Sequence, residues 1–137
     1  MLDASVALKW LVTEAHSVEA TRLLERGTEF FAPTHWRAEA ATALWARAAV
    51  RAEMSEAEAI ARIAWLAEME VTETPLAVLL NTAAALAFEL HATPYDTLYL
   101  ALAERLRVPL VTADRRLFDK AAAVPRLAPL IRWVGDL

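Results

Sequence analysis

Short apolar and β-branched runs alternate with long helix-forming segments along the whole chain, and this alternation limits the fold more than any other feature. The expected strands are residues 1–2, 29–32, 71–74, 108–112 and 130–134. The expected helices are residues 5–12, 16–26, 34–51, 55–69, 75–90, 93–107 and 115–122. Strands and helices that alternate in this way predict a parallel sheet covered by helices on both faces. We therefore expect one α/β domain over residues 1–137, with three α/β/α layers around a central, mostly parallel sheet of four to five strands.

Residues at the expected helix ends support these boundaries. Ser5 and Thr34 can each cap the helix that follows. The segment that starts at Ser55 has the form of a capping box, in which a serine and a glutamate three residues later bond each other's backbone N–H groups. Pro75 suits the first turn of a helix, and Gly27 suits the end of one.

The absence of cysteine and the scarcity of glycine exclude several kinds of functional site. The chain has no cysteine, which excludes disulfide bonds, thiolate metal sites and a cysteine nucleophile. It has only two glycines, so a glycine-rich phosphate-binding loop is excluded as well. No uncharged apolar run reaches the roughly 18 residues that cross a bilayer, and the first residues lack the pattern of a signal peptide. We expect a cytoplasmic protein without membrane contact.

The net charge does not indicate a general nucleic-acid binder. The chain carries 18 acidic side chains against 14 lysines and arginines, and its formal charge is −4. Proteins that bind nucleic acid along their surface are usually basic. This argument loses force if several acids gather around metal in one pocket, because the rest of the surface is then nearly balanced.

Two acidic residues closely follow expected strands. Asp3 follows residues 1–2, and Asp114 lies two residues after the strand at 108–112. The carboxyl ends of parallel strands meet at one edge of a sheet, where open α/β folds bind their ligands. We therefore expect Asp3 and Asp114 to lie at the same edge.

Two more acidic residues lie on helix faces that are expected to point inward. Glu39 belongs to the apolar stripe of Trp36 and Ala40, at the helical spacing of about 100° per residue. Asp96 shares a face with Tyr99. A solvated glutamate is far more common on a helix, but the apolar neighbours favour an inward position here.

Helix capping offers a second interpretation of two of these acids. In the segment from Thr93 to Asp96, the carboxylate can bond back to the cap and favour the helix dipole. Asp114 can equally be the N-cap of the helix at 115–122. Both interpretations stay open, because one carboxylate can cap a helix and also bind metal. Asp119, one helical turn further on, is expected to be a solvated residue.

Four carboxylates in one place repel each other unless a cation lies between them. Two like charges about 4 Å apart repel by about 4 kcal/mol at an effective dielectric of about 20. Hard oxygen ligands in a chain without cysteine favour Mg²⁺ or Mn²⁺. Such a site suits phosphodiester hydrolysis, because the metal activates water and neutralises phosphate oxygens. The sequence thus predicts a catalytic metal site at Asp3, Glu39, Asp96 and Asp114.

Four short segments that contain these acids resemble the PIN-domain family, in particular the VapC-type toxins of bacterial toxin–antitoxin pairs. The segments are DASVALKW at 3–10, PTHWRAE at 33–39, YDTLYLALA at 95–103 and VTADRRL at 111–117. They occur in the family's order and with its spacing. Each segment alone is weak evidence, whereas four in register are specific.

The resemblance implies a fold, an activity and partners. It implies a central parallel sheet flanked by helices, Mg²⁺- or Mn²⁺-dependent cleavage of RNA, and the four acids as metal ligands. Ser5 and Thr112 match polar positions that often support the site. It also implies a homodimer and a VapB-type antitoxin that inserts a peptide into the acidic groove. DNA would then be contacted only through the antitoxin.

The sequence departs from the family in one respect. Family members usually have several apolar residues before the first aspartate, whereas only Met1 and Leu2 precede Asp3 here. We therefore expect a short central strand.

Several other residues have open roles. Lys9, Arg115 and Arg116 lie near the expected site in sequence and could hold RNA phosphates, although a solvated position is equally expected. The histidines lack the spacing of a metal pair, so a histidine base is not expected, and His35 is assigned to the first turn of its helix. Trp65 could belong to a dimer or antitoxin surface, or to the core.

Two other functions compete with a ribonuclease. A catalytically silent binding module with the same fold would use the acids for a structural cation or a partner protein. RNA turnover that stops with a chelator separates these two functions. A phosphoacceptor receiver domain would need an acidic pair at the first strand and a late lysine. Leu2 and Asp3 supply no pair, and no lysine follows in the segment from Thr112 to Asp114, so we rank this function last.

Overall fold

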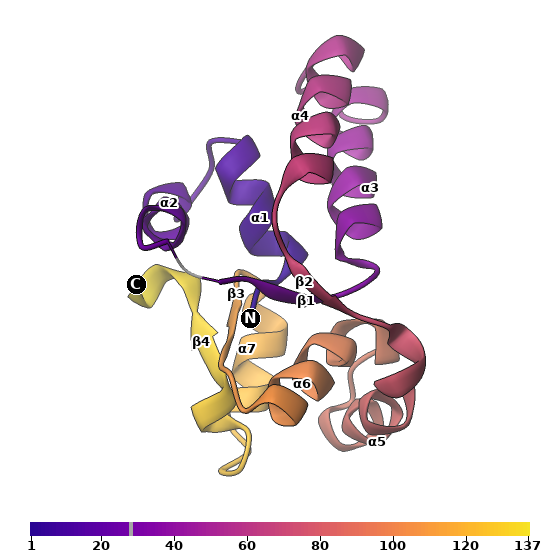
Figure 1. The fold of residues 1–137 in the computed structure, drawn as a ribbon, viewed down its shortest axis with the longest axis vertical. Coiled ribbons are helices and arrows are strands. Elements are labelled where there is room, and N and C mark those ends of the chain that lie inside the picture. Colours follow the sequence, from indigo (N-terminus) through magenta and orange to yellow (C-terminus); the bar gives the residue numbers. More distant parts are fainter. Residues whose placement is uncertain (28) are drawn as a thin grey trace.

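The computed structural model describes residues 1–27 and 29–137 (Figure 1). Its α-helices are α1 (Ala4–Leu11), α2 (Ser17–Glu25), α3 (Trp36–Ala49), α4 (Glu56–Glu68), α5 (Leu80–Leu90), α6 (Pro94–Leu106) and α7 (Arg115–Ala122). Its strands are β1 (Phe31–Pro33), β2 (Thr72–Thr74), β3 (Leu110–Thr112) and β4 (Ile131–Trp133). Short 3₁₀ helices lie at η1 (Leu76–Val78), η2 (Ala128–Leu130) and η3 (Val134–Asp136). The chain therefore has the expected α/β fold.

The strands form two parallel pairs, β1 with β2 and β3 with β4. The first two residues lie between the pairs. Leu2 forms a parallel bridge with Val111, and the Leu2 N–H donates to the Phe31 carbonyl at 2.9 Å. Among the described residues, the pairs are thus joined by a single bridge and not by a continuous ladder. The expected short central strand is thus a single bridge at Leu2.

The helices surround the strand pairs (Figure 1). α3 and α4 form a hairpin that projects away from the strands, and α1 packs against both α2 and α3. α5 packs against α6, while α7 packs against β3 and β4. The C-terminal η3 contacts α2, so the chain ends beside that helix.

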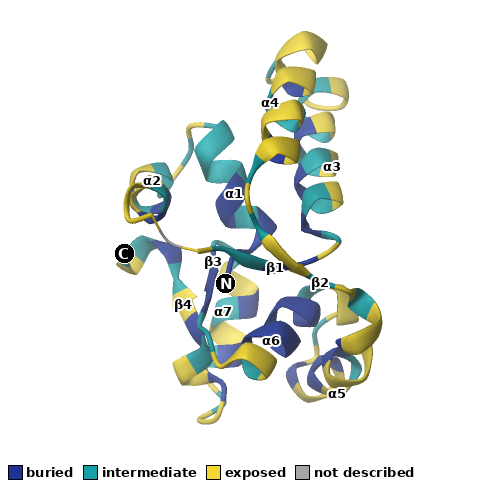
Figure 2. Ribbon diagram, in the orientation of Figure 1, coloured by how far each residue is buried: buried dark blue, intermediate teal, exposed yellow. Residues whose placement is uncertain are grey.

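Helix α6 is deeply buried over most of its length (Figure 2). Every residue from Thr97 to Ala103 is buried. Tyr99 on this helix and Trp36 on α3 are the bulkiest of the fully buried side chains. Burying an aromatic side chain of this kind stabilises the fold by roughly 2 to 3 kcal/mol. The burial of α6 also fixes the position of Asp96 in its first turn.

Some expected helix starts are wrong in detail. Asp3, and not Ser5, caps α1, because the Asp3 carboxylate accepts the Ser5 N–H at 2.9 Å. Thr34 does not cap α3, since the N-cap position belongs to His35, whose side chain makes no capping bond. After Pro75 the chain first forms η1, and the α-helix begins only at α5.

Other local expectations are confirmed. The capping box at the start of α4 is present: Glu58 donates its N–H to Ser55 Oγ at 3.2 Å, and Ser55 donates its N–H to Glu58 Oε2 at 2.8 Å. Strands β3 and β4 lie where expected but have only three residues each. Across residues 1–27 and 29–137, no helix has the length and apolar character needed to cross a membrane.

Candidate active site

Asp3 is buried at the start of α1. The Ser5 N–H donates to Oδ1 at 2.9 Å, and the Thr112 hydroxyl donates to Oδ2. Burial raises the pKa of Asp3 and the charge of Asp114 raises it further, although the bonds from Thr112 and Ser5 act in the opposite direction. Burial thus acts against the ionised form of this carboxylate, and a nearby cation would favour it.

Thr112 and Ser5 connect the first acid to the last. The Thr112 hydroxyl donates to Asp3 and also accepts the N–H of Asp114 at 3.0 Å. Ser5 Oγ accepts the N–H of Ala113 at 3.0 Å. Both side chains therefore tie the end of β3 to the start of α1, which holds two of the acids in a common framework.

Asp96 and Asp114 are half-buried and lie at helix starts. Asp96 Oδ2 accepts the Thr93 hydroxyl at 2.8 Å, and the Asp96 N–H donates back to that hydroxyl at 3.2 Å. Asp114 Oδ1 accepts the N–H groups of Arg116 and Leu117 at 2.8 and 3.1 Å. The capping interpretation is therefore confirmed for both acids. It leaves open whether the same carboxylates bind metal.

Glu39 on α3 lies within reach of the charges of the other three acids. Its side chain is 30% exposed, and the Tyr99 hydroxyl donates to Oε2 at 2.7 Å. Burial raises the pKa of Glu39 to about 7 against the effect of the Tyr99 bond, and the charges of the other three acids contribute to the rise. Exposed charges are screened beyond about 10 Å. Asp3, Asp96 and Asp114, from three other segments, thus lie near enough to Glu39 for their charges to act on it.

The four carboxylates do not form a ready-made metal cage. Over the part of the chain that the structure describes, no group of three or more His, Asp or Glu side chains has the spacing that holds an ion. The donor set still fits Mg²⁺ or Mn²⁺, because all four side chains offer hard oxygen ligands. A cation would also reverse the raised pKa values of Asp3 and Glu39, since it favours their ionised forms.

Known proteins resemble this chain in sequence over most of its length. The family model of the PIN domain matches residues 1–124. Ribonuclease VapC12 of Mycobacterium tuberculosis is 34% identical over 119 residues, which cover 85% of this chain and 88% of that protein. Ribonuclease VapC3 of Pyrobaculum aerophilum is 32% identical over 126 residues, which cover 90% and 95%. The chain belongs to the PIN-domain family. Within it, the relatives group this chain with the VapC-type members, as the four sequence segments implied.

His35 is a residue of this PIN domain that the sequence did not single out. Its side chain is 8% exposed, its Nε2 lies 3.6 Å from Glu39 Oε2, and neither ring nitrogen has a hydrogen-bond partner among the described residues. The rings of Tyr95 and Tyr99 pack against it at centroid distances of 4.6 and 5.0 Å. Burial lowers the pKa of His35, so the ring is neutral at neutral pH. The available sequence signal was the i and i+4 spacing of His35 and Glu39 on one helix face.

The three expected phosphate-binding residues have different surroundings. The Lys9 ammonium donates to Glu14 at 2.9 Å and to the carbonyl of Ala15 at 2.8 Å, and its side chain is only 9% exposed. Arg115 is exposed and forms an ion pair with Asp119 at 2.9 Å. Arg116 is exposed one residue further on. The Lys9 ammonium is therefore already bound by other groups, whereas the two arginine side chains are accessible to solvent.

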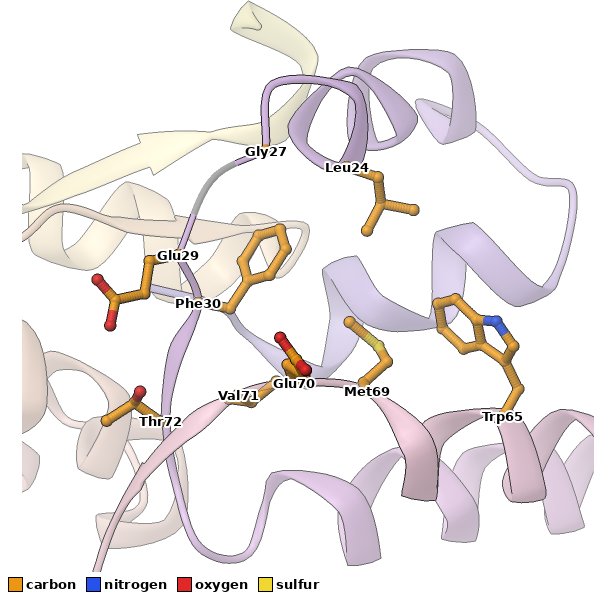
Figure 3. A pocket seen from close by; sticks show the side chains of 9 residues that line it. All are labelled: Leu24, Gly27, Glu29, Phe30, Trp65, Met69, Glu70, Val71 and Thr72. Atoms are coloured by element: carbon orange, nitrogen blue, oxygen red, sulfur yellow. The ribbon is translucent and has the colours of Figure 1, made fainter.

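A large cavity lies away from the acids, between the end of α2 and the end of α4 (Figure 3). Its volume is about 830 Å³, and its apolar walls include Leu24, Phe30, Trp65 and Met69. None of the four acids lines it. The cavity is thus a separate feature with an apolar wall and two acidic side chains, Glu29 and Glu70, at its lining.

Proposed function

We propose that this PIN domain is a metal-dependent endoribonuclease and the toxin of a VapBC-type toxin–antitoxin pair. The observation that carries the proposal is the coupling of Glu39 to Asp3, Asp96 and Asp114, which come from separate segments of the chain. The similarity to ribonucleases VapC12 and VapC3 supports RNA as the substrate. The first observation points to the site and the second to the substrate.

The four acids are the proposed ligands of Mg²⁺ or Mn²⁺. When bound, the ion supplies a more acidic water and stabilises the charge that develops on the phosphate. Ser5 and Thr112 hold the Asp3 carboxylate, and Thr93 holds that of Asp96. In-line attack of water on the scissile phosphate then leaves a 5′-phosphate and a 3′-hydroxyl.

Arg115 and Arg116 are the proposed contacts to RNA phosphates. Both side chains are exposed in the first turn of α7, directly after Asp114. A guanidinium can bond two phosphate oxygens at once. We omit Lys9 from this role, because Glu14 and a backbone carbonyl already hold its ammonium group.

We further infer that the two strand pairs act as one central sheet of a three-layer PIN fold. The bridge between Leu2 and Val111 and the bond from Leu2 to Phe31 support this inference. The sheet is weak at its centre, because Leu2 forms only one bridge to β3. Hydrogen exchange would test this, since one cooperative sheet predicts similar protection of the Leu2 and Val111 amides.

The proposed partners are an antitoxin and a second copy of the chain. The cavity between α2 and α4 suits an apolar segment of a VapB-type antitoxin, with Trp65 at its wall. DNA is then contacted only through the antitoxin, and the pair acts in the cytoplasm. Sedimentation of the toxin with and without the product of the adjacent gene tests both associations. A chain that stays monomeric and does not bind this product would contradict both associations.

The activity is tested by replacing Asp96 with asparagine. Asp96→Asn keeps the shape of the side chain and an oxygen for the Thr93 hydroxyl, but removes the negative charge. We expect RNA cleavage in Mg²⁺ or Mn²⁺ to fall by about 100-fold or more. Asp136→Asn, a matched control at an exposed position in η3, retains activity. Full activity of a folded Asp96→Asn variant would contradict the proposed site.

A catalytically silent binding module is the second candidate function. The observation that favours it is the lack of a ready-made three-ligand group in the described ranges. Such a module binds its partner with or without Mn²⁺ and never turns over RNA. Cleavage that appears with Mn²⁺ and stops with EDTA excludes it.

A further inference from the structure

The buried imidazole of His35 lacks hydrogen bonds although it lies beside the candidate active site. Its Nδ1 and Nε2 are the only buried side-chain nitrogen or oxygen atoms without a partner in the described part of the chain. Leaving a buried polar group unpaired opposes folding. A native fold rarely keeps such a group, so this one calls for a physical explanation.

The position of the ring is well defined. His35 and Glu39 are four residues apart and face the same side of α3. Tyr95 packs edge-on against the imidazole at an interplanar angle of 72°, and Tyr99 packs at 50°. These rings leave Nε2 directed at Glu39, with 3.6 Å between Nε2 and Oε2. A small movement of the Glu39 side chain would bring the two atoms within hydrogen-bond distance.

We propose that His35 is a positioning residue that donates its Nε2–H to Glu39 Oε2 when the carboxylate binds a divalent cation. Tyr99 already donates to the same oxygen at 2.7 Å. Two donors on Oε2 leave Oε1 as the oxygen that faces the cation. The inference rests on the proposed metal site and specifies how Glu39 is oriented within it. Hydrogen bonds to a ligating carboxylate commonly tune metal affinity by about 10- to 100-fold.

The surroundings argue against His35 as a metal ligand itself. A ligating histidine usually donates its second ring N–H to a carboxylate, a carbonyl or water. His35 Nδ1 is buried and has no such acceptor among the residues described. In the proposed role Nδ1 carries no proton, so the only unsatisfied atom is an acceptor.

Mn²⁺ affinity of the full chain, measured by calorimetry, tests the role. His35→Leu keeps an apolar side chain of similar reach and removes the donor, and we expect its Kd to rise by about 10-fold or more. His35→Gln, whose amide nitrogen can reach the place of Nε2, is expected to stay within about 3-fold of the wild type. His91→Asn, at an exposed helix end, is the matched control and keeps the wild-type affinity.

The outcomes separate this inference from the proposed function. Wild-type protein that binds no Mn²⁺ contradicts the metal site and the inference with it. Wild-type affinity in His35→Leu overturns the inference alone. Equal loss in His35→Leu and His35→Gln also overturns it, because the ring would then act through its shape and not as a donor.

A measurement on the wild-type chain keeps the test independent of how the variants fold. Nitrogen-15 NMR of the imidazole at pH 7.5 reports which ring nitrogen carries the proton. We expect a neutral His35 with the proton on Nε2, both without metal and at saturating Mg²⁺. A proton on Nδ1, a doubly protonated ring, or direct coordination through Nε2 would overturn the proposal.

Discussion

The candidate site has two halves that hold their acids in different ways. Asp96 and Asp114 lie at helix starts, where nearby hydroxyl or N–H groups bond their carboxylates in a half-exposed setting. Burial is the largest influence on Asp3 and Glu39 and raises the pKa of each, although Asp3 also caps α1 and the Glu39 side chain is 30% exposed. Burial thus acts against the ionised forms of Asp3 and Glu39.

A cation bound at the proposed site would favour the ionised forms of Asp3 and Glu39. A buried carboxylate without a countercharge opposes folding. A capping carboxylate has a structural role whether or not metal is bound. We therefore expect a bound metal ion to matter most for Asp3 and Glu39.

The largest expected effect follows the change Asp3→Asn. We expect RNA cleavage in Mn²⁺ to fall by about 1000-fold, because a ligand charge at the centre of the site is lost. The metal-free variant should unfold at the same or a higher temperature than the wild type, since the amide avoids the cost of a buried charge. Cleavage assays and thermal unfolding in EDTA measure the two effects. A clearly lower unfolding temperature together with retained RNA cleavage would contradict both expectations.

The second effect is a loss of stability with rising pH in the metal-free protein. The pKa of Glu39 is about 7 in the folded state against an ordinary value of 4.5. Between these values the folded chain holds a proton that the unfolded chain has released, so the free energy of unfolding falls as pH rises. We expect a fall on the order of 2 kcal/mol, and the raised pKa of Asp3 acts in the same direction.

Urea unfolding in EDTA at several pH values between 4.5 and 8 measures this fall. Glu39→Gln is the control, because it removes the titrating group and flattens most of the profile. Saturating Mg²⁺ should flatten the wild-type profile as well. A wild-type profile that rises with pH in EDTA would show that the buried acids are not destabilised.

The smallest effect compares two helix caps. Thr93 caps α6 beside Asp96, whereas Ser55 caps α4, a helix that contains none of the four acids. Thr93→Val and Ser55→Ala should each lower the free energy of unfolding by about 1 kcal/mol. Only Thr93→Val should also slow RNA cleavage, by about 10-fold, since it releases the Asp96 carboxylate. Equal cleavage rates in the two variants would show that Asp96 needs no positioning by Thr93.

Local patterns predicted the elements that local chemistry determines. The helix at 115–122, the capping box at Ser55 and the parallel direction of the strands follow from short-range signals and were confirmed. The separation into two strand pairs was not predicted, because it depends on how Leu2 bonds to segments far away in the sequence. The same holds for the cap of α1, where Asp3 replaces Ser5.

For the site, the acids could be predicted and their surroundings could not. Carboxylates that follow strands or lie on apolar helix faces can be recognised in the sequence. In the structure, the charges of the other three acids act on Glu39. The contacts of His35 with Tyr95 and Tyr99 join segments about sixty residues apart, so no local pattern encodes them. Whether the acids bind metal stays a prediction.

The most direct test of one shared metal site is diffraction from a crystal soaked in Mn²⁺, with data collected near the manganese absorption edge. We expect an anomalous peak within bonding distance of carboxylate oxygens from both halves of the site, Asp3 or Glu39 on one side and Asp96 or Asp114 on the other. A well-occupied peak elsewhere, with the four carboxylates free of Mn²⁺, would contradict it.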